Sequence, residues 1–403
     1  MKKRCLSVLL LAALTFSLCG CGNLFEKEYV VVEDYVPGAS QDSSGEEKIV
    51  VKSLSSLKQA IQRMVTDGAA QGSIVFASDY SGDLTEDLAS ACWQVRTQNA
   101  LCAYCVENIS YELNRIVSHT EAEIRISYVD FGGTMEDITK LSFSSGLEEL
   151  ILNTLTHSGE KLAVYVTNGT YTAEGVENLV QSVYRAHPSC VPGEPRTTVN
   201  VYSGTGLQRL YEIRFKYGMT EEEMETRRGK LSALEPFAEL DTQGLSQGAK
   251  ALAACTYLVE NCLLSESQTD NSAYSALLDG AANSEGLALA YVELCHRLGL
   301  ECDIVYGLKD WNDHCWNIVT VDGENYHVDV SSCIENWIGS GFLLSDQQLW
   351  GAYRWDISSY ASCSGGLSYA VVAGVPEREN STWTGEDPAD AGEEEPEHPD
   401  DAE

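Results

Sequence analysis

The sequence predicts an α+β protein: two tandem small α/β repeats, followed by a C-terminal domain with a helix packed on an antiparallel sheet. Three observations predict this fold class. Residues 272–331 show a helical pattern followed by alternating strands, residues 49–129 and 138–218 repeat one order of elements, and both chain ends have compositions typical of segments outside a folded core. A chain of 403 residues has room for two or three domains.

The N-terminus has the pattern of an export signal. Basic residues at 2–4 precede an apolar run too short to span a bilayer, which ends in Leu18-Cys19-Gly20-Cys21. This ending resembles the lipobox of bacterial lipoproteins, and an ordinary secretory signal is the alternative. We expect residues 1–20 to be a signal peptide and Cys21 to carry lipid such as palmitate. The cell membrane would then be a partner through that lipid, with the protein anchored on its extracytoplasmic, extracellular side.

The acidity of the chain limits its partners. A formal net charge of −35 does not suit binding to nucleic acid backbones through a general basic patch, so we expect no nucleic acid partner. Residues 21–48 comprise the lipidated cysteine and a disordered linker, because they lack hydrophobic periodicity. Residues 374–403 form an acidic disordered tail; a solubilising role is favoured over binding of cations or basic wall proteins.

The cysteine count argues against a disulfide framework. Three of the 14 cysteines lie in the leader and the lipidation site, and the odd number that is left cannot all pair. Buried free thiols are expected on apolar helix faces, at Cys92, Cys255 and Cys295. Isolated disulfides, such as one using Cys302 or Cys333, stay an alternative.

The two repeats share the order helix, strand, helix, strands. The paired segments are helices at 57–65 and 147–155, strands at 74–76 and 163–165, helices at 83–96 and 173–186, and closing strands at 124–128 and 213–217. The first copy has an additional predicted helix at 104–117. Cys102 and Cys105 form a lone CxxC without a second pair at metal spacing, so we expect no metal and no cofactor.

The C-terminal domain, residues 219–373, begins with a short acidic helix at 221–228 and a helix at 246–262. A turn at 280–283 leads to a helix that starts at Ser284, and serine fills a helix N-cap well. Asp322-Gly323 is a strong hairpin signal between two strands. The predicted strands and the last elements are strands at 303–307, 315–321 and 326–330, a helix at 343–355 and a possible strand at 369–372.

The hairpin brings polar residues together. Whether its loop has two or four residues, His314 and Asp329 fall on the same face of adjacent strands. Ser284, at a helix N-terminus, could face them. A hydroxyl, an imidazole and a carboxylate in this arrangement have the form of a nucleophile, a base and an orienting acid.

This stretch resembles the transglutaminase-like superfamily, which has a papain-like core. The resemblance lies in SAYSALLDGAANSEGLALAYVELCHRLGLEC, in HCWN at 314–317 and in NYHVDVSSC at 325–333, with LAACTYLVENCLL similar to a family helix upstream. It implies that Ser284, His314 and Asp329 occupy the catalytic triad positions. The family has a cysteine where this chain has Ser284. Cys315 points to the opposite strand face, and Cys295 lies too far down the helix to replace it.

The substitution changes the chemistry. A cysteine beside histidine ionises to a thiolate readily, whereas a serine hydroxyl must lose its proton in the transition state and needs an oxyanion hole. We therefore expect a pseudoenzyme, a degenerate domain that binds or scaffolds at the cell surface, with a cell-wall peptide or surface protein as partner. The alternative is an active Ser-His-Asp amidase, peptidase or acyltransferase acting on peptide or cell-wall amides. A third reading makes the repeats the functional part, binding a wall polymer.

Overall fold

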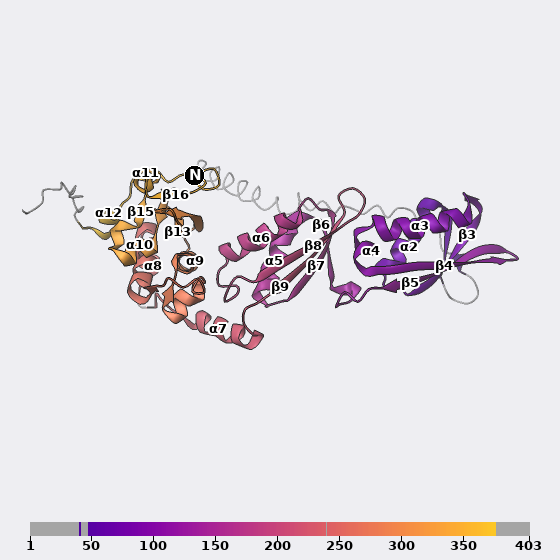
Figure 1. The fold of residues 1–403 in the computed structure, drawn as a ribbon, viewed down its shortest axis with the longest axis horizontal. Coiled ribbons are helices and arrows are strands. Elements are labelled where there is room, and N and C mark those ends of the chain that lie inside the picture. Colours follow the sequence, from indigo (N-terminus) through magenta and orange to yellow (C-terminus); the bar gives the residue numbers. More distant parts are fainter. Residues whose placement is uncertain (1–39, 42–46, 239, 376–403) are drawn as a thin grey trace, which may run out of the picture. The chain divides into compact units, whose positions relative to one another are not determined.

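The computed structural model describes residues 40–41, 47–238 and 240–375 (Figure 1). The chain divides into two compact units, one ending at Met135 and the other beginning at Glu136. The expectations for the leader, for Cys21 and for the acidic tail lie outside the described residues, as does most of the linker. Within the described part, no helix is long and apolar enough to cross a bilayer. The mixed α+β class is confirmed.

The first unit is one sheet covered by helices. Its sheet has the order β1-β2-β3-β5-β4, with β2 and β3 parallel and the other pairs antiparallel. Helix α2 starts after Ser53 because Ser53 and Ser56 form a capping box. The elements are β1 (Ser40–Gln41), β2 (Glu47–Ser53), α2 (Leu54–Thr66), β3 (Gln71–Ser81), α3 (Leu84–Gln98), α4 (Ala100–Cys105), β4 (Val106–Ile116) and β5 (His119–Tyr128).

The predicted helix at 104–117 is wrong. Helix α4 ends at Cys105, and the following residues form β4, which pairs along its length with β5. The sequence does carry the strand period: Ile109 is buried and Leu113 half-buried, while Ser110 and Glu112 between them are exposed. Pairing with β5 therefore outweighs the helical propensity of the segment and makes it a strand.

The second unit opens with a segment of similar topology, residues 138–216, called here the second α/β segment. Its sheet order is β6-β7-β9-β8, with β6 and β7 parallel, which parallels the order β2-β3-β5-β4 of the first unit. That the two arose as repeats of one unit stays a prediction. The elements are η1 (Met135–Asp137), β6 (Ile138–Phe143), η2 (Ser144–Gly146), α5 (Leu147–Thr156), β7 (Lys161–Asn168), α6 (Ala173–Ala186), β8 (Arg196–Ser203) and β9 (Arg209–Lys216).

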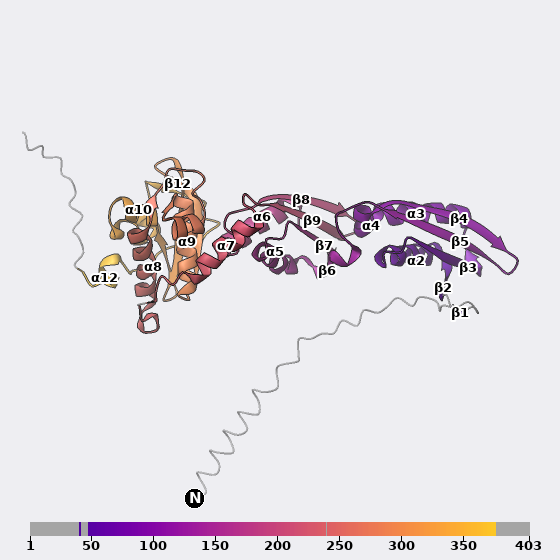
Figure 2. The same ribbon diagram turned by 90° about the horizontal axis from the view of Figure 1, so that it is seen from below.

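The C-terminal part packs helices on an antiparallel sheet of order β15-β14-β13-β12-β16. Helix α9 (Ser284–Arg297) contacts β12 (Cys302–Lys309) and β13 (Asn312–Val321). Figure 2 shows α9 beside β12. The other helices are α7 (Glu221–Ala233), η3 (Thr242–Gly244), α8 (Gln247–Asn261), the π-helix η4 (Ser275–Asp279), α10 (Val330–Glu335), η5 (Ile338–Ser340), α11 (Asp346–Leu349) and α12 (Tyr369–Ala373). The other strands are β10 (Leu263–Leu264), β11 (Ala281–Ala282), β14 (Glu324–Val328), β15 (Phe342–Leu344) and β16 (Tyr353–Arg354).

The predicted hairpin is confirmed. Val321 pairs with Glu324, so the loop has two residues, and both adopt positive φ, 52° at Asp322 and 83° at Gly323. This is the geometry of the tight turns that match strand twist. The loop fixes the register of β13 on β14.

Two other predictions for the C-terminal part are wrong. The stretch at 343–355 is not one helix: Leu343, with a φ of 53°, lies in strand β15, and Ser345 caps a separate four-residue helix, α11. The stretch at 369–372 is a one-turn helix, α12, instead of a strand. Its Tyr369 ring packs edge-on against Trp337, and α12 contacts α8, so it joins a helical layer.

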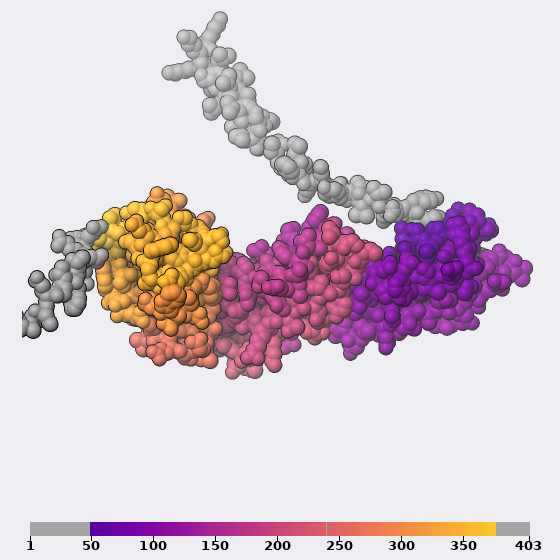
Figure 3. Space-filling view, turned by 45° about the horizontal axis from the view of Figure 1, so that its top comes forward, coloured from indigo at the N-terminus to yellow at the C-terminus, as the bar shows by residue number. Residues whose placement is uncertain are grey.

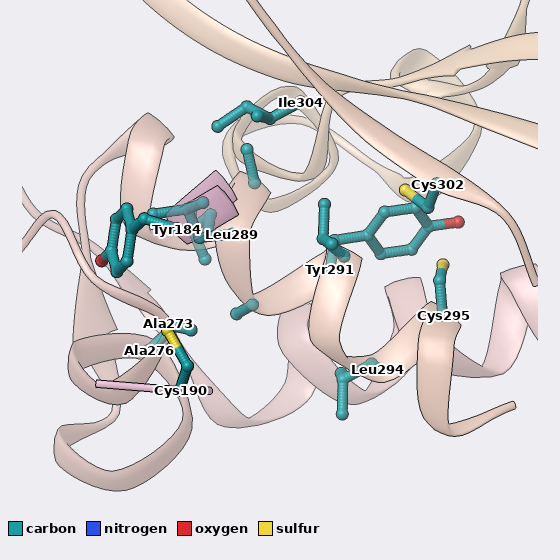
Figure 4. Packing of buried hydrophobic residues seen from close by; sticks show 14 of the residues in the cluster. Tyr184, Cys190, Ala273, Ala276, Leu289, Tyr291, Leu294, Cys295, Cys302 and Ile304 are labelled. Atoms are coloured by element: carbon teal, nitrogen blue, oxygen red, sulfur yellow. The ribbon is translucent and has the colours of Figure 1, made fainter. Parts of the chain in front are cut away.

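The second α/β segment and the C-terminal part share one hydrophobic core. Tyr184 and Cys190 belong to the same buried cluster as Ala273 and Ala276 (Figure 4), and the surfaces of the two parts are continuous in Figure 3. The Tyr274 hydroxyl donates a hydrogen bond to the Ser189 carbonyl, 2.8 Å away. The boundary expected near residue 219 is thus a change of topology within one packed unit.

Candidate functional site

Ser284 is the first helical residue of α9. The N-cap is Asn283, whose side-chain oxygen accepts the Gly286 N–H at 3.0 Å, so the prediction that Ser284 fills the cap itself is wrong. Gly286 lets the first turn lie close to another segment, since a Cβ there would meet the Asp270 carbonyl at 2.7 Å. The Ser284 Oγ accepts a hydrogen bond from the Cys315 backbone N–H at 3.3 Å.

His314 and Asp329 form a direct pair. The Nε2 of His314, in β13, lies 2.9 Å from Oδ2 of Asp329, the residue that follows the adjacent strand β14. The His314 side chain is 12% exposed and that of Asp329 only 1% exposed. A carboxylate this deep needs other donors to offset the cost of removing it from water.

Those donors surround Asp329. Its oxygens accept hydrogen bonds from the Ser331 hydroxyl at 2.5 Å, the Ser332 N–H at 3.1 Å, the Ser332 hydroxyl at 2.7 Å and the Tyr353 hydroxyl at 2.6 Å. The Lys309 ammonium lies 3.7 Å away. Burial alone would raise the Asp329 pKa, but the hydrogen bond from His314 and the charges of His314 and Lys309 hold that pKa well below its usual range. Asp329 is therefore a carboxylate at neutral pH.

Sequence reasoning missed these supporting residues. Ser331 and Ser332 lie two and three residues after Asp329, which caps α10. The sequence Asp-x-Ser-Ser is typical of a helix start and could have indicated these residues. Lys309 pairs with Tyr353 in the β12–β16 register, so both reach Asp329 from the same side. No local signal marked Tyr353, because it comes from a stretch expected to be helical.

Ser284 reaches the backbone beside His314 without reaching the imidazole. Among the described residues, no hydrogen bond joins the Ser284 hydroxyl to His314; the contact runs to the N–H of Cys315. The Cys315 thiol itself lies nearby, but burial first, and the Glu285 charge second, raise its pKa to about 12. It is a neutral thiol at physiological pH, which makes it a poor nucleophile.

A second histidine lies on the same sheet face. The Trp316 Nε1–H donates to Nδ1 of His327 at 3.0 Å, and Nε2 of His327 lies 2.8 Å from Oδ1 of Asp346. Since Nδ1 accepts, the single proton of the neutral ring is on Nε2 and is donated to Asp346. Burial lowers the His327 pKa and outweighs the hydrogen bond that the ring donates to Asp346, which acts to raise that pKa.

His327, Asp346 and Cys363 also place their ligand atoms within 4.8 Å of one another, as a metal site would. The hydrogen bonds argue against that use. A metal on Nε2 would require the ring proton on Nδ1, where it would confront the Trp316 N–H. Asp346 is further engaged by the Cys363 N–H at 3.2 Å and the Ser362 hydroxyl at 3.0 Å. The cluster is a satisfied polar network that supports the sheet.

The site thus combines a helix N-terminus with a histidine–carboxylate pair on an antiparallel sheet, and one family model matches this part of the chain. The model of the transglutaminase-like superfamily matches residues 238–330, which contain all three predicted triad positions. These residues form a transglutaminase-like domain. No curated protein matches the chain.

Solved structures give only distant likenesses. A crystal structure of a TGase is 10% identical with a TM-score of 0.25, covering 52% of this chain and 61% of its own. A protein provisionally assigned as a cysteine protease from Cytophaga hutchinsonii is 11% identical with a TM-score of 0.24, covering 42% and 69%. A provisionally assigned protease from Parabacteroides distasonis ATCC 8503 is 10% identical with a TM-score of 0.20, covering 52% and 45%. This chain thus spans less than two thirds of the length of the TGase.

Proposed function

We propose that this protein is a lipoprotein, anchored outside the cell membrane through Cys21, whose transglutaminase-like domain binds or scaffolds at the cell surface without catalysis. One observation carries the non-catalytic assignment. The Ser284 hydroxyl oxygen accepts a backbone N–H from Cys315 at 3.3 Å and makes no hydrogen bond to His314 among the described residues. An activated serine would instead donate its proton to the imidazole.

The surroundings of Asp329 support the same proposal. In a triad the carboxylate stabilises the imidazolium that forms when the nucleophile loses its proton. Here the Lys309 ammonium, 3.7 Å from Oδ2, offsets that negative charge, and four hydrogen bonds from Ser331, Ser332 and Tyr353 spread it further. These partners hold Asp329 as a carboxylate whether or not Ser284 reacts, so the His314–Asp329 pair is compatible with a non-catalytic site.

A second candidate function is an active Ser-His-Asp enzyme that cleaves or transfers peptide or cell-wall amides. The specific observation in its favour is the His314–Asp329 pair itself, 2.9 Å long, with a buried carboxylate and an imidazole that keeps some exposure. Such a pair orients a general base well. The two candidates differ in whether Ser284 reacts.

Labelling with a fluorophosphonate, read by intact mass, tests the assignment. We expect no adduct on the wild-type protein, and none on His314→Ala, the matched control for base-dependent labelling. Stoichiometric labelling at Ser284 that disappears in His314→Ala would establish the serine enzyme instead. The anchoring is tested separately by Cys21→Ala, which should move the protein from the membrane fraction to the soluble fraction; retention in the membrane would contradict a lipid on Cys21.

A further inference from the structure

A cleft opens where the second α/β segment meets the C-terminal sheet. Its volume is about 340 Å³, at the small end of the range of about 300–1,000 Å³ for ligand sites. Helix α6 forms one wall, and strands β12 and β13 form the other. The lining residues are Ser182, Arg185, Ala186, Asp303, Ile304, Ile318, Ser359, Tyr360 and Ala361.

Arg185 is the unusual member of this lining. Its guanidinium carbon lies 3.9 Å from the centre of the Tyr306 ring, a cation–π contact that fixes the plane of the group. Within the described part of the chain, Arg185 forms no hydrogen bond or ion pair, and its buried Nε has no acceptor. A guanidinium carries five N–H donors, and a donor that is buried without an acceptor, as the Arg185 Nε–H is, costs free energy.

Three carboxyl groups lie near Arg185, and none of them forms a hydrogen bond or an ion pair with it among the described residues. Glu194 is close enough for the Arg185 charge to act on its pKa, although burial still raises that pKa. Glu285, which follows Ser284, accepts the Tyr306 hydroxyl at 2.8 Å and the Asn271 amide at 3.3 Å. Asp303 lines the cleft without pairing with Arg185. Together with Glu194, these carboxyl groups make the surroundings acidic, so a ligand with several negative charges would be repelled. A single carboxylate matches the guanidinium fork with the least repulsion.

We propose that this cleft is a binding site for the free carboxylate terminus of a peptide, held by the Arg185 guanidinium between α6 and β12. The other walls suit a short peptide: Ile304 and Ile318 offer apolar contact, and Ser182 and Tyr360 offer hydroxyls. The Tyr306 ring stacks under Arg185, and the Tyr306 hydroxyl donates a hydrogen bond to the carboxylate of Glu285, the residue after Ser284. The cleft therefore adjoins the N-terminus of α9. The proposal holds whether or not Ser284 reacts.

Two probes that differ only in charge test it. N-acetyl-trialanine with a free carboxylate, and the same peptide as its carboxamide, are titrated into the intact protein labelled with ¹⁵N at arginine. We expect the acid to shift the Arg185 Nε–H resonance and to bind at least tenfold more tightly than the amide. Arg185→Gln should lose this preference, and Arg185→Lys should keep only part of it, because an ammonium lacks the planar fork.

Arg354→Gln is the matched control, since the Arg354 guanidinium also stacks 3.9 Å over an aromatic ring, Trp311, but lies outside this cleft. It should bind the acid as the wild type does. Equal affinity for acid and amide, no response of the Arg185 resonance, or unchanged binding in a folded Arg185→Gln would each overturn the proposal. Thermal unfolding of every variant identifies misfolding, and Arg185→Lys supplies a second variant that keeps the stacked cation.

Discussion

Two histidine–carboxylate pairs lie on one face of the C-terminal sheet. They differ in how many nitrogens of the imidazole ring have hydrogen-bond partners among the described residues. In the pair of His327 and Asp346, both ring nitrogens are engaged, Nδ1 by Trp316 and Nε2 by Asp346, and the His327 side chain is 1% exposed. In the pair of His314 and Asp329, the carboxylate is more deeply buried than the imidazole. The His314 ring contacts the carboxylate through its Nε2.

The comparison teaches that a histidine beside a carboxylate is not in itself a catalytic device. What separates the pairs is the second ring nitrogen. Where that nitrogen accepts a buried indole N–H, the ring is held in one tautomer and burial lowers its pKa, so it serves packing. Where the ring keeps access to solvent and lies beside a helix N-terminus, it is available for chemistry or binding.

The largest expected effect concerns the buried carboxylate. Asp329→Ala removes the acceptor of His314 and of three hydroxyl donors, together with the cap of α10, so we expect a loss of about 3–5 kcal/mol in unfolding free energy. Asp346→Ala, whose side chain is 28% exposed, should lose about 1–2 kcal/mol. Urea unfolding measures both. Equal losses would contradict the difference in burial.

The next largest effect concerns the hydrogen bond between Trp316 and His327, which has no counterpart at His314. Trp316→Phe keeps the aromatic packing but removes the N–H donated to His327, at a cost of about 1–2 kcal/mol. It also frees Nδ1 to take a proton, so the pKa of His327 should rise. An NMR titration of the imidazole C–H resonances follows this, with His327→Gln assigning the signal. A His327 pKa unchanged by Trp316→Phe would mean that the indole does not control the tautomer.

A pH dependence follows from the lowered pKa of His327. Because the folded-state pKa lies below the ordinary value of 6.5, the unfolded chain takes up a proton in a range where the folded protein does not. Stability should therefore fall as the pH drops below about 6.5, until the folded His327 also titrates. His327→Gln should lack this loss. Asp329 adds a second loss only as the pH falls below its ordinary value of 3.8. Chemical denaturation at a series of pH values separates the two ranges.

The smallest expected effect is on stability at the candidate site. His314→Gln retains an amide donor for Asp329 at a partly exposed position, so we expect a loss below about 1 kcal/mol. His327→Gln, at a fully buried ring with two partners, should lose more. Unfolding curves of the two variants, collected side by side, provide the comparison; a reversed order would contradict it.

The pairing of His314 with Asp329 was predictable, because the strand period and a two-residue turn fix the register between them. The position of Ser284 at the start of α9 was predictable from the small-residue turn before it. The positions of Tyr353 beside Asp329 and of Arg185 in the cleft were not predictable, since each depends on the tertiary packing of a distant segment. The β4 strand was mistaken for a helix because its weak alternation competes with good helix formers, and only its pairing with β5 decides between them.

The most direct test of the account is the reactivity of Ser284→Cys. Iodoacetamide at mildly acidic pH, with mass mapping of the label, should modify position 284 at least tenfold faster than a simple thiol, because a thiolate there can pair with His314. The rate should collapse in Ser284→Cys with His314→Gln and persist with Asp346→Asn, which alters the other pair. The native cysteines of the described residues are buried or, at Cys315, held neutral, so they should stay unlabelled. A slow thiol, or one indifferent to His314, would contradict a retained site that lacks only its nucleophile.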